Sequence, residues 1–317
     1  MPTTRDQALL VRAATLYYLE GKSQAEVAAE IGVSRSNVSR VLASARKHGI
    51  VDIRINDPFG RAIEMENQLV ERFGLAECRV APSGQQDALP RVGELGANWL
   101  MERLPDTGMI SMSWGSSVQA VVDSVGANPV HPGLEILPLV GGLSIVDAAR
   151  DGNILVRSLA MKLGAKHRRL HAPAVVETKE TRDAFLKEPS ISTVLNAASE
   201  SQIAIVGIGS VGYGASLAIL DSMHLNLAEM AEFQQSGAVG DCCTRYFDRN
   251  GHVVDSPASD RVVSIDLPSL RKVPTVVGVA TGARKAAGVH GALMGKLVDV
   301  LIIDSALAQA LLKLPQP

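Results

Sequence analysis

The spacing of apolar residues divides the chain into a helical N-terminal part and a longer part in which strands and helices alternate. Residues 6–20 carry apolar side chains at helical spacing, and Gly21 should end this helix. Two more helices are predicted over residues 23–31 and 34–48. An Asp-Pro-Phe-Gly run at 57–60 is a strong break. Because 317 residues exceed the usual size of one domain, we expect two domains, 1–57 and 58–317.

The second and third predicted helices have the signals of a helix-turn-helix. Ser23 and Glu26 have the spacing of a capping box, which marks a helix start. Gly32 tolerates the left-handed backbone that a tight turn between crossed helices needs. Ser34 is the next natural N-cap. Residues 51–56 then alternate apolar and polar side chains, which predicts a short strand like that of a DNA-binding wing.

Charge supports DNA binding by the third helix. Residues 34–48 contain four basic residues and no acidic one, and residues 1–56 contain eight Lys or Arg against five Asp or Glu, whereas the whole chain is −2. A positive segment on a slightly acidic protein is expected where phosphates are contacted. The side chains predicted to contact DNA are Ser34, Arg35, Ser36, Asn37, Ser39 and Arg40. The alternative is an ordinary helix pair with a solvated basic face.

The longer part has the pattern of a parallel sheet covered by helices on both faces. Nearly all-apolar strands are predicted over 76–82, 108–114, 134–140, 168–174, 202–208, 261–267, 273–279 and 298–304. Helices are predicted over 61–73, 87–104, 116–125, 153–163, 179–198, 283–295 and 304–313. Such alternation is typical of Rossmann-like α/β domains.

Composition narrows the class of protein. Apolar residues make up 46% of the chain, yet no apolar run reaches the roughly 20 residues that cross a bilayer. The three cysteines have neither metal-ligand spacing nor a disulfide framework. We therefore expect a soluble cytoplasmic protein with no membrane partner, no metal site and no cofactor.

The loops after several predicted strands carry the residues of a ligand site. In a doubly wound sheet, ligands bind beyond the carboxyl ends of the strands. After one strand come Gly115, Ser116 and Ser117 at a helix start, where two hydroxyl groups and the helix N-terminus could hold a phosphate. Ordinary helix capping explains the same three residues equally well.

Three other loops contribute candidates. Gly141 and Gly142 end a strand and precede Asn153 on a helix, and Asp241 in a glycine-rich loop could accept hydrogen bonds from sugar hydroxyls. Lys285 lies at a strand-to-helix junction, where it could meet an anion or simply face water. A G-x-G-x-x-G run formed by glycines 207, 209 and 212 is not taken as a dinucleotide fingerprint, because no clear helix is predicted behind it.

In this order, the motifs resemble the SorC family of bacterial transcriptional regulators across essentially the whole chain. The matching segments include the helix-turn-helix, SWGSS (113–117), PLVGG (138–142), VGIG (206–209), GAVGD (237–241) and the helix that contains Lys285. The resemblance implies a helix-turn-helix domain joined to an effector domain similar to phosphosugar isomerases. It also implies a dimer or tetramer that binds double-stranded operator DNA under the control of a phosphorylated sugar or polyol.

The resemblance also implies roles for single residues. Ser116 and Ser117 would hold the effector phosphate, Asp241 and Lys285 would contact the sugar, and Asn153 would add a contact from the helix after Gly141 and Gly142. Many family members have glycine where Thr244 and Thr281 stand, which could reshape the pocket.

Two other functions fit parts of the pattern. A phosphosugar isomerase or deaminase with a DNA-binding appendage would need an acid–base group, for which Asp241 and His171 are the candidates. A thiol sensor would use Cys242 and Cys243, although only Arg245 nearby could lower a thiol pKa. We expect a regulator that is not an enzyme.

Overall fold

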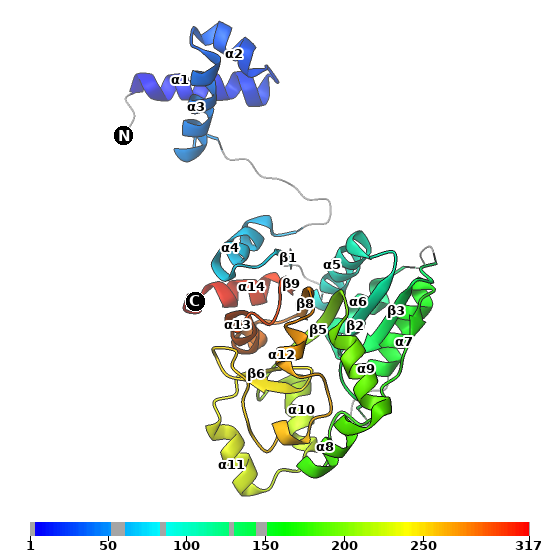
Figure 1. Ribbon diagram of the computed structural model, residues 1–317. Coiled ribbons are helices and arrows are strands. Elements are labelled where there is room, and N and C mark those ends of the chain that lie inside the picture. The colour runs from blue at the N-terminus through cyan, green and yellow to red at the C-terminus, as the bar shows by residue number, and fades with distance from the viewer. Residues whose placement is uncertain (1–3, 52–60, 83–86, 127–129, 144–150, 317) are drawn as a thin grey trace. The chain divides into compact units, whose positions relative to one another are not determined.

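The computed structural model describes residues 4–51, 61–82, 87–126, 130–143 and 151–316. Contacts group the chain into two units, Met1–Pro58 and Phe59–Pro317 (Figure 1). Helix α1 (Thr4–Ala14) of the first unit continues into the π-helical turn η1 (Thr15–Leu19), and α2 (Gln24–Ile31) and α3 (Arg35–Lys47) follow. Their shared core consists of Ala13, Leu16, Val27, Ala28, Val38 and Leu42.

The predicted local signals of the helix-turn-helix are confirmed. The backbone N–H of Ser23 donates to Glu26 Oε2 at 2.8 Å and the Glu26 N–H donates to Ser23 Oγ at 3.3 Å, which is a complete capping box. Gly32 has φ 72°, and Ser34 caps α3 by accepting from the Asn37 N–H. The expected wing strand falls, apart from its first residue, outside the described residues.

The larger unit is built on a sheet whose main strands are all parallel. The strands are β1 (Glu77–Ala81), β2 (Gly108–Met112), β3 (Leu134–Pro138), β4 (Lys166–His167), β5 (Ile203–Ser210), β8 (Thr275–Ala280) and β9 (Val300–Asp304). Their order is β1-β9-β8-β5-β2-β3-β4. The predicted α/β class is therefore confirmed.

Helices cover both faces of this sheet, as its apolar strands require. In β9, Val300 and Ile302 pack in one core layer and Leu301 and Ile303 in the other, because successive strand side chains point to opposite faces. The first layer contains α5 (Ala88–Arg103), α6 (Ser116–Ser124) and α7 (Gly152–Leu163). The second contains α4 (Ile63–Phe73), α13 (Ala286–Met294) and α14 (Ser305–Leu312) (Figure 1).

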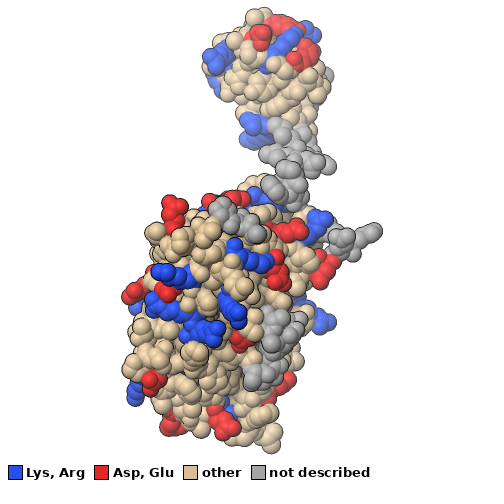
Figure 2. Space-filling view, turned by 90° about the vertical axis from the view of Figure 1, so that its right-hand side faces the viewer, with Lys and Arg blue, Asp and Glu red and all other residues tan. Residues whose placement is uncertain are grey.

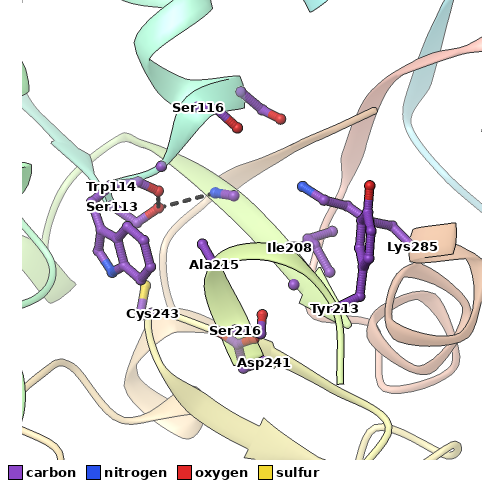
Figure 3. A pocket seen from close by; sticks show the side chains of 14 residues that line it. Ser113, Trp114, Ser116, Ile208, Tyr213, Ala215, Ser216, Asp241, Cys243 and Lys285 are labelled. Carbon is purple, nitrogen blue, oxygen red and sulfur yellow. Dashed lines mark hydrogen bonds between the residues drawn. The ribbon is translucent and has the colours of Figure 1, made fainter. Parts of the chain in front are cut away.

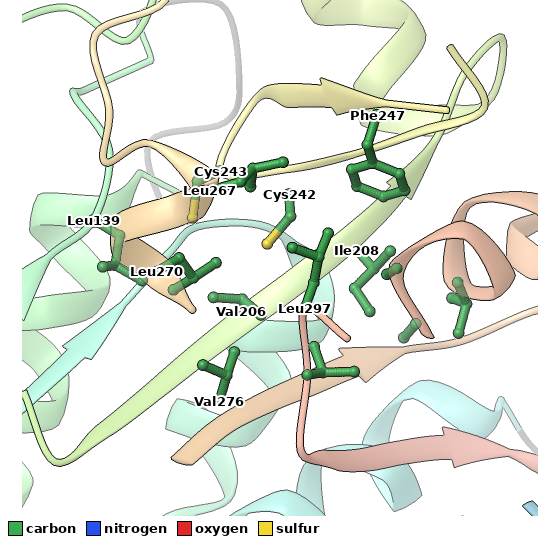
Figure 4. Close-up of a cluster of buried hydrophobic side chains, with 14 of the residues drawn as sticks. Leu139, Val206, Ile208, Cys242, Cys243, Phe247, Leu267, Leu270, Val276 and Leu297 are labelled. Carbon is green, nitrogen blue, oxygen red and sulfur yellow. The ribbon is translucent and has the colours of Figure 1, made fainter. Parts of the chain in front are cut away.

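A short antiparallel hairpin extends β5 beyond the main sheet. It is formed by β6 (Gly240–Cys242) and β7 (Arg245–Phe247), and Gly209 of β5 pairs with Asp241. Cys243 and Thr244 form its turn with φ of 53° and 63°. Cys242 points into the apolar core beside Val206 and Leu297 (Figure 4).

Several predicted elements are wrong. Segments 168–174 and 261–267 are not strands of the sheet, since isolated bridges such as Gly142–Pro173 and Val175–Val262 connect them to other loops. The helix predicted over 179–198 is split, because Pro189 begins a new helix. The elements in this region are α8 (Lys179–Lys187), α9 (Pro189–Ser199), α10 (Gly214–Ser222), α11 (Leu227–Gln235), η3 (Ser259–Arg261) and α12 (Leu267–Leu270). Of these, α10, α11, η3 and α12 were not predicted.

Candidate functional site

The main cavity of interest lies where the direction of strand addition reverses. From β2 the chain continues outward through β3 and β4, whereas from β5, the other neighbour of β2, it continues through β8 and β9. Doubly wound sheets bind ligands at such a switch point. The cavity contains about 490 Å³ of empty space, part of it open to solvent, and is lined by Ser113, Trp114, Gly115, Ser116, Ser117, Gly207, Ile208, Gly209, Tyr213, Ala215, Ser216, Asp241, Cys243 and Lys285 (Figure 3).

The N-terminus of α6 forms one wall. Gly115 precedes the helix with φ 114° and ψ 166°, a conformation that is essentially restricted to glycine. Ser116 and Ser117 are the first two helical residues, so the free N–H groups of the helix start are next to the cavity. The Ser117 side chain is buried, and its Oγ has no hydrogen-bond partner among the described residues.

The ends of β2 and β5 are held together beneath this wall. Ser113 Oγ accepts a hydrogen bond from the Gly207 N–H at 3.0 Å. A Cβ at Gly207 would lie 3.2 Å from the Trp114 carbonyl oxygen, so glycine allows the two backbones to approach. Gly212, in the same glycine run, adopts φ 77° in the turn before α10. The expectation that no helix follows this run is wrong.

Asp241 lies on the opposite wall. Its carboxylate accepts a hydrogen bond from the Ser216 hydroxyl and another from the Thr244 N–H in the hairpin turn. A Cβ at Gly209 would lie 2.1 Å from Asp241 Oδ1, so the carboxylate occupies the space above a glycine. Burial raises the pKa of Asp241, although the hydrogen bond from Ser216 and the charge of Lys285 act against the shift.

Lys285 reaches the cavity from the loop after β8. Asp304 Oδ1, at the end of β9, accepts from the Gly282 N–H at 2.7 Å and so fixes this loop. The Lys285 ammonium makes no hydrogen bond or salt bridge to a described residue. Burial lowers its pKa, and the carboxylates of Asp241 and Asp304 oppose that shift. In Figure 3 the amine points into the cavity, toward the wall that carries Ser116.

Several lining residues were missed by the sequence reasoning. Trp114 and Ile208 provide apolar surface next to the polar groups, and the guanidinium of Arg284 lies 5.4 Å from the centroid of the Tyr213 ring at the cavity edge. Ser216 belongs to α10 and Tyr213 is the N-cap of this helix, which lacks an apolar stripe of helical period. The SWGSS motif itself was the signal that could have included Ser113 and Trp114.

Three residues predicted to contact the effector do not line this cavity. Asn153 uses its side chain to hold Leu170, accepting from its N–H at 2.9 Å and donating to its carbonyl at 3.2 Å. Gly141 lets segment 172–173 approach, because a Cβ there would lie 2.5 Å from Pro173, and the Gly142 N–H donates to the Ala172 carbonyl. The loop after β3 is one strand further from the switch point than the loops after β2 and β5.

The residues proposed for an enzyme or for a thiol sensor do not share one site. His171 is exposed and does not line the cavity that contains Asp241. Cys243 lines the cavity and Cys242 faces the core. The Cys242 pKa lies well above its ordinary value, because Cys243 forms a hydrogen bond with it and both are buried, so Cys242 stays a thiol. Among the described residues no group of three or more His, Cys, Asp or Glu could hold a metal ion.

The residues predicted to contact DNA are all exposed on α3 or at its N-cap: Ser34, Arg35, Ser36, Asn37, Ser39 and Arg40. Val38, Leu42 and Ala45, which are buried, anchor the helix in the core. Ser34 Oγ and Ser36 Oγ lie 3.0 Å apart. Within the described part of the chain, neither Arg35 nor Arg40 has an ion-pair partner. On the visible face of the larger unit, basic and acidic side chains are interspersed (Figure 2).

The described helices include none that is long and apolar enough to cross a membrane.

The family model described as "Putative sugar-binding domain" matches residues 57–313. The Sorbitol operon regulator of Klebsiella pneumoniae is 31% identical over 99% of this chain and 100% of its own length. The Deoxyribonucleoside regulator of Bacillus subtilis is 32% identical over 96% of this chain and 97% of its own. The crystal structure of the full-length K. pneumoniae sorbitol operon regulator, SorC, superposes with a TM-score of 0.75 at 29% identity, covering 98% of this chain and all of that one.

Proposed function

Because the chain belongs to the SorC family of sugar-responsive bacterial transcriptional regulators, we propose that its cavity binds a phosphorylated sugar or polyol and that α3 binds operator DNA. The protein is a transcriptional regulator of a carbohydrate or polyol operon. The effector changes operator binding because it has different affinities for two arrangements of the protein. The cytoplasm, where the operator lies, is the proposed location.

The unpartnered Ser117 hydroxyl is the observation that carries the effector assignment. A buried hydroxyl without a partner costs about 1–3 kcal/mol, so a ligand oxygen in this place recovers that free energy. The free N–H groups of the α6 start supply further donors and the positive end of the helix dipole, both of which favour a phosphate. The phosphate therefore binds at Gly115, Ser116 and Ser117.

The polar groups across the cavity suit the hydroxyl end of the effector. Asp241 accepts hydrogen bonds from sugar hydroxyls, and Lys285 donates to the oxygens of the same molecule. Trp114 and Ile208 provide apolar surface for its carbon atoms. Gly141, Gly142 and Asn153 shape the neighbouring loops without contacting the effector.

On the DNA side, α3 lies in the major groove with Arg35 and Arg40 toward phosphates and bases. One recognition helix per chain favours a dimer or tetramer that reads pseudo-palindromic half-sites about 34–36 Å apart, or a multiple of that. We infer that the cavity binds its ligand without converting it, because the relatives of this chain are named as regulators and not as enzymes.

A ligand screen and an operator assay test the proposal together. Sorbitol 6-phosphate and 2-deoxyribose 5-phosphate are each compared with the unphosphorylated compound by thermal denaturation, and a ligand at 100 times its Kd adds about 2.7 kcal/mol. Ser117→Asp should abolish the response through charge repulsion, while Ser117→Thr keeps the hydroxyl. Arg35→Ala with Arg40→Ala should abolish binding to the DNA beside the gene and leave the ligand response intact. Turnover of a phosphosugar, or a Ser117→Asp protein that responds normally, would contradict the proposal.

A further inference from the structure

Helix α13 touches the effector cavity at its first turn. Its N-cap is Lys285, whose amine lies in the cavity, and the Gly282 and Lys285 backbones form the turn that leads into the helix. An effector that binds Lys285 therefore acts directly on the beginning of α13.

Two glycines bring one face of α13 close to β5 and to the β6–β7 hairpin. A Cβ at Gly288 would lie 2.0 Å from the Gly209 carbonyl oxygen, and one at Gly291 would lie 2.8 Å from the Asp248 carbonyl oxygen. At Gly288 the contact is backbone against backbone, so no side chain there can change rotamer to absorb a shift of β5, whereas Gly291 also meets the side chains of Val239 and Phe247. The helix must follow a shift of β5 as a body.

The other side of α13 contacts the first helix of the larger unit. The ring of His290 meets the ring of Phe73 edge to face, with centroids 5.8 Å apart, and His290 Nε2 lies 3.1 Å from the Pro315 carbonyl oxygen. The neighbouring Arg72 donates to the carbonyl oxygens of Leu312 and Leu314. Helix α4, α13 and the C-terminal end of the chain therefore meet at one cluster.

Helix α4 is the first helix after the DNA-binding unit along the chain. We propose that α13 transmits effector binding from Lys285 to α4 through the contact between His290 and Phe73. This inference rests on the proposed function of the cavity. It adds two residues, both outside the cavity, whose role is to couple the effector to operator affinity.

The test measures coupling separately from binding. For each variant, the operator Kd is measured with and without sorbitol 6-phosphate or 2-deoxyribose 5-phosphate, whichever stabilises the wild-type protein, and the Kd of that phosphate is measured without DNA. The ratio of the two operator Kd values, typically about 5 to 150 in allosteric proteins, should fall toward 1 in His290→Ala and in Phe73→Leu. The operator Kd without phosphate and the phosphate Kd should stay within about twofold of wild type. The control is His167→Ala, which replaces a half-buried histidine on edge strand β4 and should keep the wild-type ratio.

A double variant tests whether His290 and Phe73 affect the coupling through one contact or independently. If both residues act through one contact, His290→Ala with Phe73→Leu should lower the ratio no further than either change alone. Wild-type ratios in both single variants would overturn the inference and leave the proposed function standing. If neither phosphate stabilises the wild-type protein, the proposed function fails and the inference fails with it.

Discussion

Replacing Gly209 by alanine should damage the effector cavity while the sheet stays intact. Gly209 lies on β5 directly opposite Asp241 in the register of the hairpin. An alanine Cβ would lie 2.0 Å from Ser216 Oγ and 2.1 Å from Asp241 Oδ1, where ordinary contacts are at least 3.4 Å. Both polar atoms must therefore move by more than an ångström, and the hydrogen bond between them is the first interaction to be lost.

Overpacking sets the expected fall in Tm, and the lost contact with Asp241 sets the expected fall in effector affinity. Extra atoms in a tightly packed site cost about 1–3 kcal/mol. In a unit of this size each kcal/mol lowers Tm by about 2–4 °C, so Gly209→Ala should melt about 2–12 °C below wild type. A hydrogen bond to a charged group contributes about 1.5–3 kcal/mol, so displacing the Asp241 carboxylate should weaken effector binding roughly 10- to 150-fold.

The assay is thermal denaturation with and without the phosphates of the ligand screen. Gly126→Ala is the matched control, because a Cβ there meets nothing within 4 Å and the backbone is not left-handed. Circular dichroism at 20 °C should show the same helix and strand content in both variants. If Gly209→Ala has the same Tm as Gly126→Ala and is stabilised by the phosphates as much as wild type, the Asp241 carboxylate does not lie above Gly209.

Two further changes test the electrostatics. Burial raises the pKa of Asp241, so the native state keeps the proton of this carboxyl group at pH values where the unfolded chain has released it. The free energy of unfolding therefore falls as the pH rises from the pKa of the unfolded chain toward the pKa of the native state. Asp241→Asn does not titrate and should therefore gain stability relative to wild type from about pH 4 upward, in denaturation without effector; a difference that is constant with pH would contradict this. Lys162 donates to three carbonyl groups at the α6 C-terminus, those of Val122, Asp123 and Val125, each at 2.8 Å. Lys162→Met should lower the free energy of unfolding in urea by about 1–3 kcal/mol, and the exposed Lys272→Met should leave it within about 0.5 kcal/mol.

The parts of the fold that the sequence predicted are those with a local cause. The capping box at Ser23, the left-handed Gly32 and the Ser34 cap each depend on residues within one helical turn. That Ser117 and Lys285 lie at the same edge was also predictable, because the loops after parallel strands all emerge at one edge of the sheet, whereas Asp241 comes from β6 of the hairpin. The sequence cannot show which strands are adjacent, which is why Asn153, after the outer strand β3, was included.

The missed elements lacked a periodic signal or lay outside the sheet. Helix α10 has apolar residues on more than one side, since Leu217 is exposed while Ile219 and Leu220 are buried, so no apolar stripe marks it as a helix. The capping box of Asn226 with Glu229 was a local signal for α11. Segments 168–174 and 261–267 have the composition of strands but only isolated bridges, because their partners are other loops and no strand of the sheet.

The hairpin turn shows how a departure from the family pattern acts on the site. Thr244 adopts φ 63°, a left-handed conformation that favours glycine, and its buried Oγ1 has no hydrogen-bond partner among the described residues. The preceding residue, Cys243, is left-handed too, at φ 53°. Such turns store roughly 1–3 kcal/mol per strained residue and persist only where the surroundings fix them. Here the Thr244 N–H donates to the Asp241 carboxylate and Cys243 forms part of the cavity wall, so the strained turn and the effector site are one structure. We therefore expect a substitution in the turn to change effector binding as a substitution in the cavity does.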